Sequence, residues 1–132
     1  MTRARKVKEI SFTMPNKVGL LSEVTTAVAG AKVNITAICA YAMENSAYFM
    51  LTVDSNARAK KALALLGVGI EERDVVEVEM ANKPGELQKV AGKIADADID
   101  IEYMYGTAKA GKMALCVLKT SDDQKMIKII NK

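Results

Sequence analysis

The sequence contains no histidine and no tryptophan, and only two of its 132 residues, Cys39 and Cys116, are cysteine. Histidine is a common general base and metal ligand, and two cysteines are too few for a structural zinc site or a disulfide framework. We therefore expect both cysteines to be reduced thiols, with no metal ion and no cofactor. No serine or cysteine has an evident base as its partner, and the carboxylates are not clustered, so we expect no catalytic residues.

Long hydrophobic runs are also absent. No apolar stretch reaches the roughly 18 residues that a membrane-spanning helix requires, although half of the residues are hydrophobic. Residues 1–6 are basic but lack the apolar segment of a secretion signal. We therefore predict a cytoplasmic protein that does not bind a membrane. The net charge of +3 and the 5% aromatic content favour neither a nucleic acid nor an acidic surface as partner.

An internal repeat organises the chain. The hexapeptide at residues 16–21, NKVGLL, returns 66 residues later as NKPGEL at 82–87. At that offset the following pairs are identical without a gap: Met14/Met80, Asn16/Asn82, Lys17/Lys83, Gly19/Gly85, Leu21/Leu87, Val24/Val90, Ala29/Ala95, Ala31/Ala97 and Ile35/Ile101. Such a register indicates a duplicated structural unit. We predict two domains, residues 1–72 and 73–132, that pack on each other or on a second chain because each alone is small.

The periodicity of hydrophobic residues predicts the elements of each copy. In the first copy we expect strands at 7–14, 33–42, 47–53 and 68–72, with helices at 18–31 and 57–66. In the second we expect strands at 75–80, 98–105 and 112–119, with helices at 84–97 and 123–131. A last strand has no counterpart there, so the second sheet has three strands or another segment completes it. The fold class is α+β: two ferredoxin-like βαββαβ domains, with antiparallel sheets and helices on one face.

The repeated hexapeptide lies at a strand-to-helix turn, where unpaired amide groups and the positive end of the helix dipole favour an anion such as a carboxylate. Gly19 and Gly85 allow a ligand to approach the backbone, and Pro84 suits a first helical position. The carboxamides of Asn16 and Asn82 could bind both an ammonium and a carboxylate group. Each turn is therefore a candidate site for a free amino acid. The alternative is that both asparagines only cap their helices.

A second polar position follows each helix. Asn34 and Asp100 are equivalent in the two copies and open the next strand, which is an edge strand in a ferredoxin-like sheet. An exposed edge is where two such domains can pair, because pairing satisfies free ladder groups. A ligand would then lie in the seam between the sheets. The alternative is that Asn34 and Asp100 are solvated turn residues.

The segments MPNKVGLLSEV and MANKPGELQKV, each followed by VNI or IDI, resemble the ACT domain, a small regulatory module that binds amino acids. The resemblance covers both halves and is greatest to stand-alone tandem ACT proteins without a catalytic domain. It implies a βαββαβ fold, a free amino acid as effector, a homodimer and a separate regulated enzyme. Val18 departs from the family pattern, which usually has proline there, and Met14 and Met80 replace the polar residue of some serine-sensing members. The implied binding residues are Asn16, Val18, Gly19, Leu20, Asn34, Ile35, Asn82, Pro84, Gly85, Glu86, Asp100 and Ile101.

Three other functions share this topology. An acylphosphatase-like enzyme needs an arginine cradle on the first turn, and neither turn contains arginine. RNA-recognition modules stack bases on strand aromatics, of which this chain has few, so we expect no nucleic-acid partner. A module that only binds another protein is the remaining alternative. We therefore expect a non-catalytic, allosteric, amino-acid-binding regulatory protein.

Overall fold

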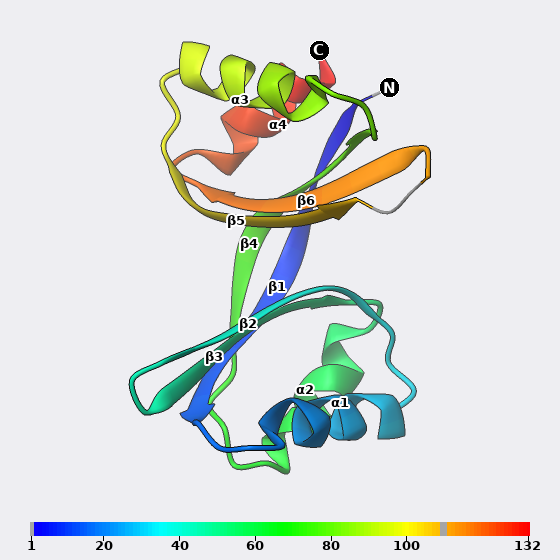
Figure 1. The fold of residues 1–132 in the computed structure, drawn as a ribbon, viewed down its shortest axis with the longest axis vertical. Helices are drawn as coiled ribbons and strands as arrows, with labels where there is room; N and C mark the ends of the chain where they lie inside the picture. Colours follow the sequence, from blue (N-terminus) through cyan, green and yellow to red (C-terminus); the bar gives the residue numbers. More distant parts are fainter. Residues whose placement is uncertain (1, 109–110) are drawn as a thin grey trace. The chain divides into compact units, whose positions relative to one another are not determined.

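The computed structural model describes residues 2–108 and 111–132 of the chain (Figure 1). The elements, in order, are β1 (Arg3–Pro15), α1 (Leu20–Gly30), β2 (Ile35–Met43), β3 (Ser46–Val53), α2 (Asn56–Ala64), β4 (Glu71–Ala81), α3 (Glu86–Asp96), β5 (Ile101–Ala108), β6 (Met113–Thr120) and α4 (Asp123–Asn131). These strands and helices form the antiparallel α+β fold expected from the sequence. In the described residues no helix combines the length and the apolar character needed to cross a membrane.

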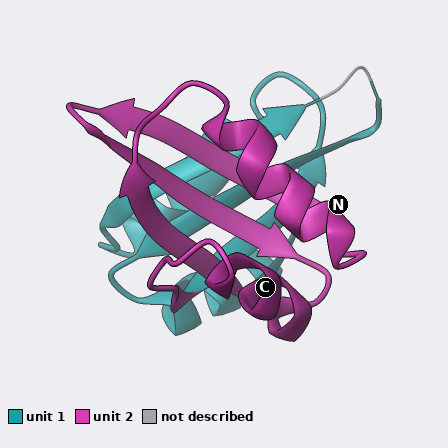
Figure 2. Cartoon of the chain, turned by 90° about the horizontal axis from the view of Figure 1, so that it is seen from below, with its two compact units in different colours: residues 1–7, 74–132 teal, residues 8–73 magenta. Residues whose placement is uncertain are grey.

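The chain forms two compact units, which Figure 2 shows in different colours. Unit 2 comprises residues 8–73 and contains the first copy of the repeat; unit 1 comprises residues 2–7 and 74–132 and contains the second copy. The strand order is β2-β3-β1-β4 in unit 2 and β1-β4-β6-β5 in unit 1. Both units therefore have the four-stranded order of the ferredoxin-like fold. β2 and β5 lie at the edges, as the sequence predicts, and the second sheet has a fourth strand that its own copy of the repeat does not supply.

The fourth strand of unit 1 is the N-terminal end of β1. The Ala4 side chain is buried in the core of unit 1, and its backbone N–H and C=O bond the side-chain amide of Asn131, both at 2.7 Å. Arg5 forms an ion pair with the buried carboxylate of Glu77, with Nε and Oε2 2.5 Å apart. Residues 2–7 thus supply the strand that the second copy lacks.

This arrangement differs from the expected continuous domain at 1–72. The alternation of apolar residues is clear only from residue 7, so the sequence predicts that the strand begins there. The strand instead begins at Arg3, and its first residues pack into the other unit. The physical reason is that β4 of unit 1 needs a neighbour for its second edge, and β1 extends far enough to provide one.

The offset between the two copies also changes along the chain. Up to the β2–β3 hairpin it is 66 residues, as the identical pairs show, but beyond it the offset is one residue larger. Pro15 pairs with Ser46 in unit 2, and the equivalent Ala81 pairs with Met113 in unit 1. The hairpin of unit 1 therefore contains one additional residue, and Lys132 is equivalent to Leu65, not to Leu66 as a constant offset would require.

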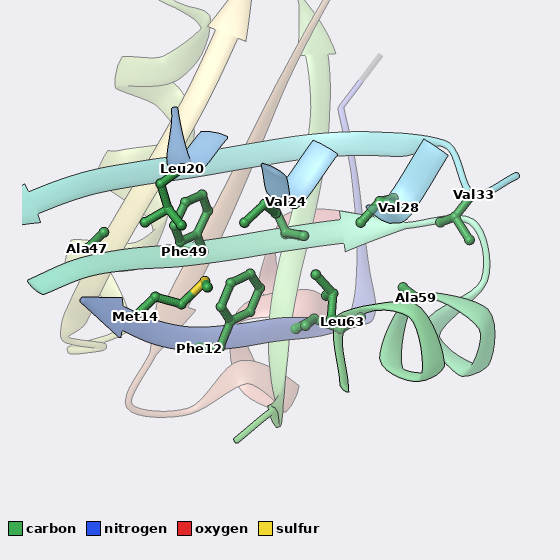
Figure 3. Packing of buried hydrophobic residues seen from close by; sticks show 12 residues of the cluster. Phe12, Met14, Leu20, Val24, Val28, Val33, Ala47, Phe49, Ala59 and Leu63 are labelled. Atoms are coloured by element: carbon green, nitrogen blue, oxygen red, sulfur yellow. The ribbon is translucent and has the colours of Figure 1, made fainter. Parts of the chain in front are cut away.

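Two separate cores stabilise the units. In unit 2 the buried face of α1, made by Leu20, Val24 and Val28, packs on Phe12 and Phe49 of the sheet (Figure 3). In unit 1 the core has the same plan, with Val90 and Ile94 of α3 and Met126 and Ile130 of α4 over β4 and β6. The second helix of each unit begins at an equivalent cap, because Ser55 and Asp122 accept hydrogen bonds from the amides of Arg58 and Lys125.

Candidate functional site

The two strand-to-helix turns have the same backbone conformation. Gly19 and Gly85 both have φ of 87°, a left-handed conformation that glycine adopts without a steric penalty, and the helices begin at the following residues, Leu20 and Glu86. A Cβ added at either glycine would meet no described atom within 4 Å, so the space over each turn is open. Glycine is therefore required here by the backbone angle, and it leaves the start of the helix accessible.

Neither helix start is capped by a side chain in the part of the chain that the structure describes. Asn16 and Asn82 lie three residues before these glycines and are therefore not the N-cap residues of their helices. Their backbone N–H groups instead bond the carbonyls of Asn45 and Lys112 at the neighbouring hairpins, at 2.8 and 2.9 Å. The Asn82 amide also donates to the carbonyl of Gly111 at 3.2 Å. The hairpin thus holds each turn. The first helical amides, those of Leu20 and Glu86, donate to the carbonyls of Lys17 and Lys83 at 3.4 and 3.3 Å, and the amides of the next two residues have no partner within the helix.

The charges at the two helix starts differ. In unit 2 the first helical residue is the buried Leu20, and Lys17 pairs with Glu23 one turn further on, with 2.9 Å between Nζ and Oε2. In unit 1 the first helical residue is Glu86, which pairs with Lys89 at 2.9 Å. The hydrogen bond from Lys89 lowers the pKa of Glu86, so its carboxylate is ionised at neutral pH. The start of α3 is consequently less suited to a bare anion than the start of α1.

Asn34 and Asp100 lie at the other end of the helices. Both residues are exposed, and their backbone groups close the strand start: Asn34 exchanges hydrogen bonds of 2.9 and 3.1 Å with Asp54, and Asp100 exchanges bonds of 3.0 and 2.9 Å with Ser121. In each unit the strand start and the turn lie at opposite ends of a helix of 11 residues, which is about 16 Å long. Within one unit the structure therefore does not bring the turn and the strand start together.

A hollow of about 340 Å³ opens in unit 1 beside the start of α3. Asn82, Lys83 and Glu86 lie at its polar end. Its apolar lining comes from Met80 on β4, Leu87 on α3, Met104 and Gly106 on β5, and Ala114 and Cys116 on β6. The hollow is lined by four elements, β4, α3, β5 and β6, so a ligand at the turn would have apolar surface within reach.

The family of the chain follows from comparison with known proteins. The ACT domain pair family matches residues 5–132, which is nearly the whole sequence. The chain belongs to the ACT family. No curated protein matches it in sequence. Its two ACT domains correspond to the two copies of the repeat.

Solved structures show the same fold. Protein BT0572 from Bacteroides thetaiotaomicron is 31% identical, with a TM-score of 0.88 over 97% of this chain and 88% of that one. The ligand-free regulatory subunit of aspartate kinase from Thermus thermophilus is 16% identical, with a TM-score of 0.70 over 97% and 94% of the two chains. The aspartate kinase of Clostridium acetobutylicum is 12% identical, with a TM-score of 0.65 over 98% of this chain and 33% of the enzyme. The same fold thus covers most of one of these chains and about a third of another.

The residues expected to bind a ligand lie at four places in the structure, two in each unit. Asn16, Val18, Gly19 and Leu20 lie together at the start of α1, and Asn34 and Ile35 lie together at the start of β2. In the second ACT domain Asn82, Pro84, Gly85 and Glu86 surround the start of α3, and Asp100 and Ile101 lie at the start of β5. All are exposed or half-buried except Leu20, whose side chain belongs to the core of unit 2. Leu20 can therefore offer a ligand only its backbone.

Sequence reasoning missed the apolar lining of the hollow in the second ACT domain. Met104, Gly106 and Cys116 are too far from the repeated hexapeptide to draw attention as site residues. The available signal was a difference between the copies: Phe12 is replaced by Val78, and Phe49, once the hairpin residue is counted, by Cys116. Both changes remove a ring from the interior.

The two cysteines are free thiols with different surroundings. Cys116 is buried, and burial raises the pKa of its thiol to about 11. Cys39 on β2 is half-buried, and burial together with the Glu9 carboxylate raises the pKa of its thiol. Both are therefore protonated at neutral pH and are poor nucleophiles. No group of three or more metal-binding side chains is present among residues 2–108 and 111–132.

Proposed function

We propose that this ACT domain pair is a non-catalytic regulatory protein whose effector is a free amino acid. The observation that carries the proposal is the uncapped helix start at Gly19 and Gly85, with the same backbone in both units. Amide groups there suit the carboxylate of the ligand, and the carboxamide of Asn16 or Asn82 suits its ammonium group. The family supports the choice of ligand class, because the chain shares the fold of a regulatory subunit of aspartate kinase.

The edge strands supply the second half of the site. β2 and β5 lie at the ends of their strand orders, so each presents unpaired ladder groups along with Asn34 or Asp100. Since a turn and a strand start are a helix length apart within a unit, one ligand can touch both only when the edge strand comes from a neighbouring domain. We propose a homodimer in which the ligand lies in such a seam.

Regulation follows from that geometry. A ligand held across a seam favours one arrangement of the neighbouring domains, and coupling free energies of this kind are typically about 1–3 kcal/mol. A separate enzyme that recognises this arrangement would receive the signal. The dimer can be checked by multi-angle light scattering with and without ligand, and a monomer under both conditions would exclude the seam.

A thermal-shift screen of the twenty amino acids tests the binding. At a ligand concentration 100 times its Kd, stabilisation of about 2.7 kcal/mol is expected, which raises the melting temperature by several degrees. Asn16→Ala and Asn82→Ala should each remove the response of one domain, whereas Lys61→Ala, on the exposed face of α2, should retain both. No response to any amino acid in the parent protein would refute the proposal.

A further inference from the structure

We propose that the hollow of unit 1 receives the side chain of an aliphatic or thioether amino acid, and that the rings of Phe12 and Phe49 occupy the equivalent positions in the described part of unit 2. The inference rests on the proposed amino-acid binding and adds the class of ligand and the domain that selects it. One ligand bound at the start of α3 would place its ammonium group beside the Glu86 carboxylate and the Asn82 carboxamide, its carboxylate beside Lys83, which offsets the charge of Glu86, and its side chain in the hollow.

Three substitutions between the copies create the hollow. Phe12 and Phe49 stack in unit 2 with ring centroids 5.0 Å apart, and the equivalent residues of unit 1 are Val78 and Cys116. Leu20, only 4% exposed, is the third residue of that cluster, and its equivalent is Glu86. Figure 3 shows the side chains of unit 2 filling the layer between α1 and the sheet. In unit 1 two smaller residues and one ionised residue occupy the same positions, so the layer is not filled.

The surfaces of the hollow match an amphiphilic ligand. The interior presents methionine and cysteine sulfur and alanine methyl groups, which do not satisfy a polar side chain. A buried polar group without a partner is strongly disfavoured, so polar amino acids should be rejected. The volume of about 340 Å³ exceeds the roughly 150 Å³ of an engineered apolar cavity that binds benzene, so an aliphatic chain fits.

Gly106 fixes the width of the hollow on the strand side. It pairs with Cys116 across the β5–β6 ladder, and a Cβ on Gly106 would lie 2.9 Å from the Cys116 Cβ and 3.0 Å from the Leu115 carbonyl oxygen. No side chain can be added there without moving β6. The partly exposed Leu87 and Met104 lie at the opening, where two flexible apolar side chains can cover a bound ligand.

The test is calorimetry of the full-length protein with leucine, methionine, valine, serine, aspartate and lysine. We expect leucine or methionine to bind at least tenfold more tightly than the polar amino acids. Cys116→Phe, which copies Phe49 into unit 1, should weaken that binding by at least tenfold. Cys39→Ser, a change of the other thiol, should leave it unaltered.

A second measurement needs no variant, so it stands even if Cys116→Phe fails to fold. Leucine or methionine in the hollow should slow the reaction of Cys116 with N-ethylmaleimide and leave that of Cys39 unchanged. Equal binding of leucine by the parent and by a folded Cys116→Phe protein would overturn the inference. Unaltered Cys116 labelling, or a preference for a polar amino acid, would overturn it too. None of these three results would contradict the proposed function. Absence of binding by all amino acids would remove the proposed function and this inference with it.

Discussion

The two ACT domains have the same backbone fold but different side chains in their interiors. Both have a left-handed glycine before the first helix, the same strand order and an edge strand that opens with a polar residue. In unit 2 two phenylalanines occupy the layer between α1 and the sheet, whereas in unit 1 valine and cysteine leave a hollow. The comparison shows that two copies of a repeat can retain the geometry of the strand-to-helix turn while the side chains packed beside it differ.

The units also differ in how their sheets are completed. Unit 2 takes its fourth strand from residues 71–73, where Glu72 accepts hydrogen bonds from Asn56 at 2.8 Å and Lys60 at 2.7 Å. These bonds lower the pKa of Glu72. Unit 1 takes its fourth strand from the opposite end of the chain and holds it with the amide of Asn131. Polar side chains of the second helix secure the last strand in both cases, with different chemistry.

The largest expected effect is that of deleting residues 2–7. Unit 1 would lose the packing of Ala4, both Asn131 bonds and the partner of the buried Glu77 carboxylate. Because an unsatisfied buried polar group costs about 1–3 kcal/mol, and the sheet would also lose its fourth strand, we expect unit 1 to unfold. Hydrogen exchange followed by peptide mass spectrometry should show lost protection in β5, β6 and α4, with protection retained in α1. Full protection of unit 1 would contradict the assigned strand.

Phe49→Cys makes unit 2 resemble unit 1 at its centre. Removal of a buried ring and of its stacking on Phe12 should destabilise the protein by about 3 kcal/mol, because the surrounding core relaxes only partly. Urea unfolding of variant and parent measures the loss. Leu21→Ala, at an exposed position of α1, is the control and should cost much less. A loss below that of the control would mean that the ring does not fill the layer.

Asn131→Ala removes the two hydrogen bonds that hold the borrowed strand. We expect a loss of about 1–3 kcal/mol, since the amide and carbonyl of Ala4 would lose their partners. Asn131→Asp retains the acceptor and should be intermediate. The equivalent residue in unit 2 is already Ala64, so Ala64→Ser serves as the unaffected reference. Denaturant midpoints of the three variants rank these losses, and equal midpoints for Asn131→Ala and parent would contradict the role.

Ionisation of the Cys116 thiol in unit 1 should make the free energy of unfolding depend on pH in the alkaline range. Burial raises the pKa of the Cys116 thiol to about 11 in the folded protein, whereas the unfolded thiol has its ordinary value of 9.0. The unfolded state therefore loses its proton first, so stability is complete below pH 9 and falls between pH 9 and 11, by about 1–2 kcal/mol. Unfolding at pH 8 and pH 10.5 should show this decline in the parent and a smaller one in Cys116→Ala. Identical declines in both proteins would contradict it.

The smallest effect concerns α3, which contains Gly92 where α1 has Thr26. A Cβ on Gly92 would meet no described atom within 4 Å, so Gly92→Ala should stabilise the protein by about 0.5–1 kcal/mol through the higher helix propensity of alanine. Gly106→Ala is the matched opposite, because its Cβ would collide with Cys116 and should destabilise. Thermal melts of both variants provide the check. Shifts of the same sign would show that these positions are misread.

Much of the fold could be predicted from the sequence, and the reason is local. Alternation at residues 10, 12 and 14 and helical spacing at Val24 and Val28 fix the strands and helices, and the repeat confirms each element twice. The source of the fourth strand of unit 1 could not be predicted, because Ala4 contacts Asn131 from the far end of the chain and carries no local signature. Long-range pairings of this kind depend on the whole tertiary structure.

The site was predictable in part for a similar reason. The turn glycines and edge positions follow from local backbone chemistry, so Gly19 and Asn34 could be identified by position in the repeat. The apolar lining depends on which side chains of four separate elements meet at one point. Cys116 is equivalent to Phe49 only when the additional hairpin residue is counted, so the constant offset of the sequence repeat does not identify it.

The borrowed strand also has a consequence for biosynthesis. Asn131, which holds Ala4, is synthesised 127 residues after it. The unit of residues 8–73 can therefore fold while synthesis continues. The unit formed by residues 2–7 and 74–132 cannot secure its fourth strand until α4 has left the ribosome.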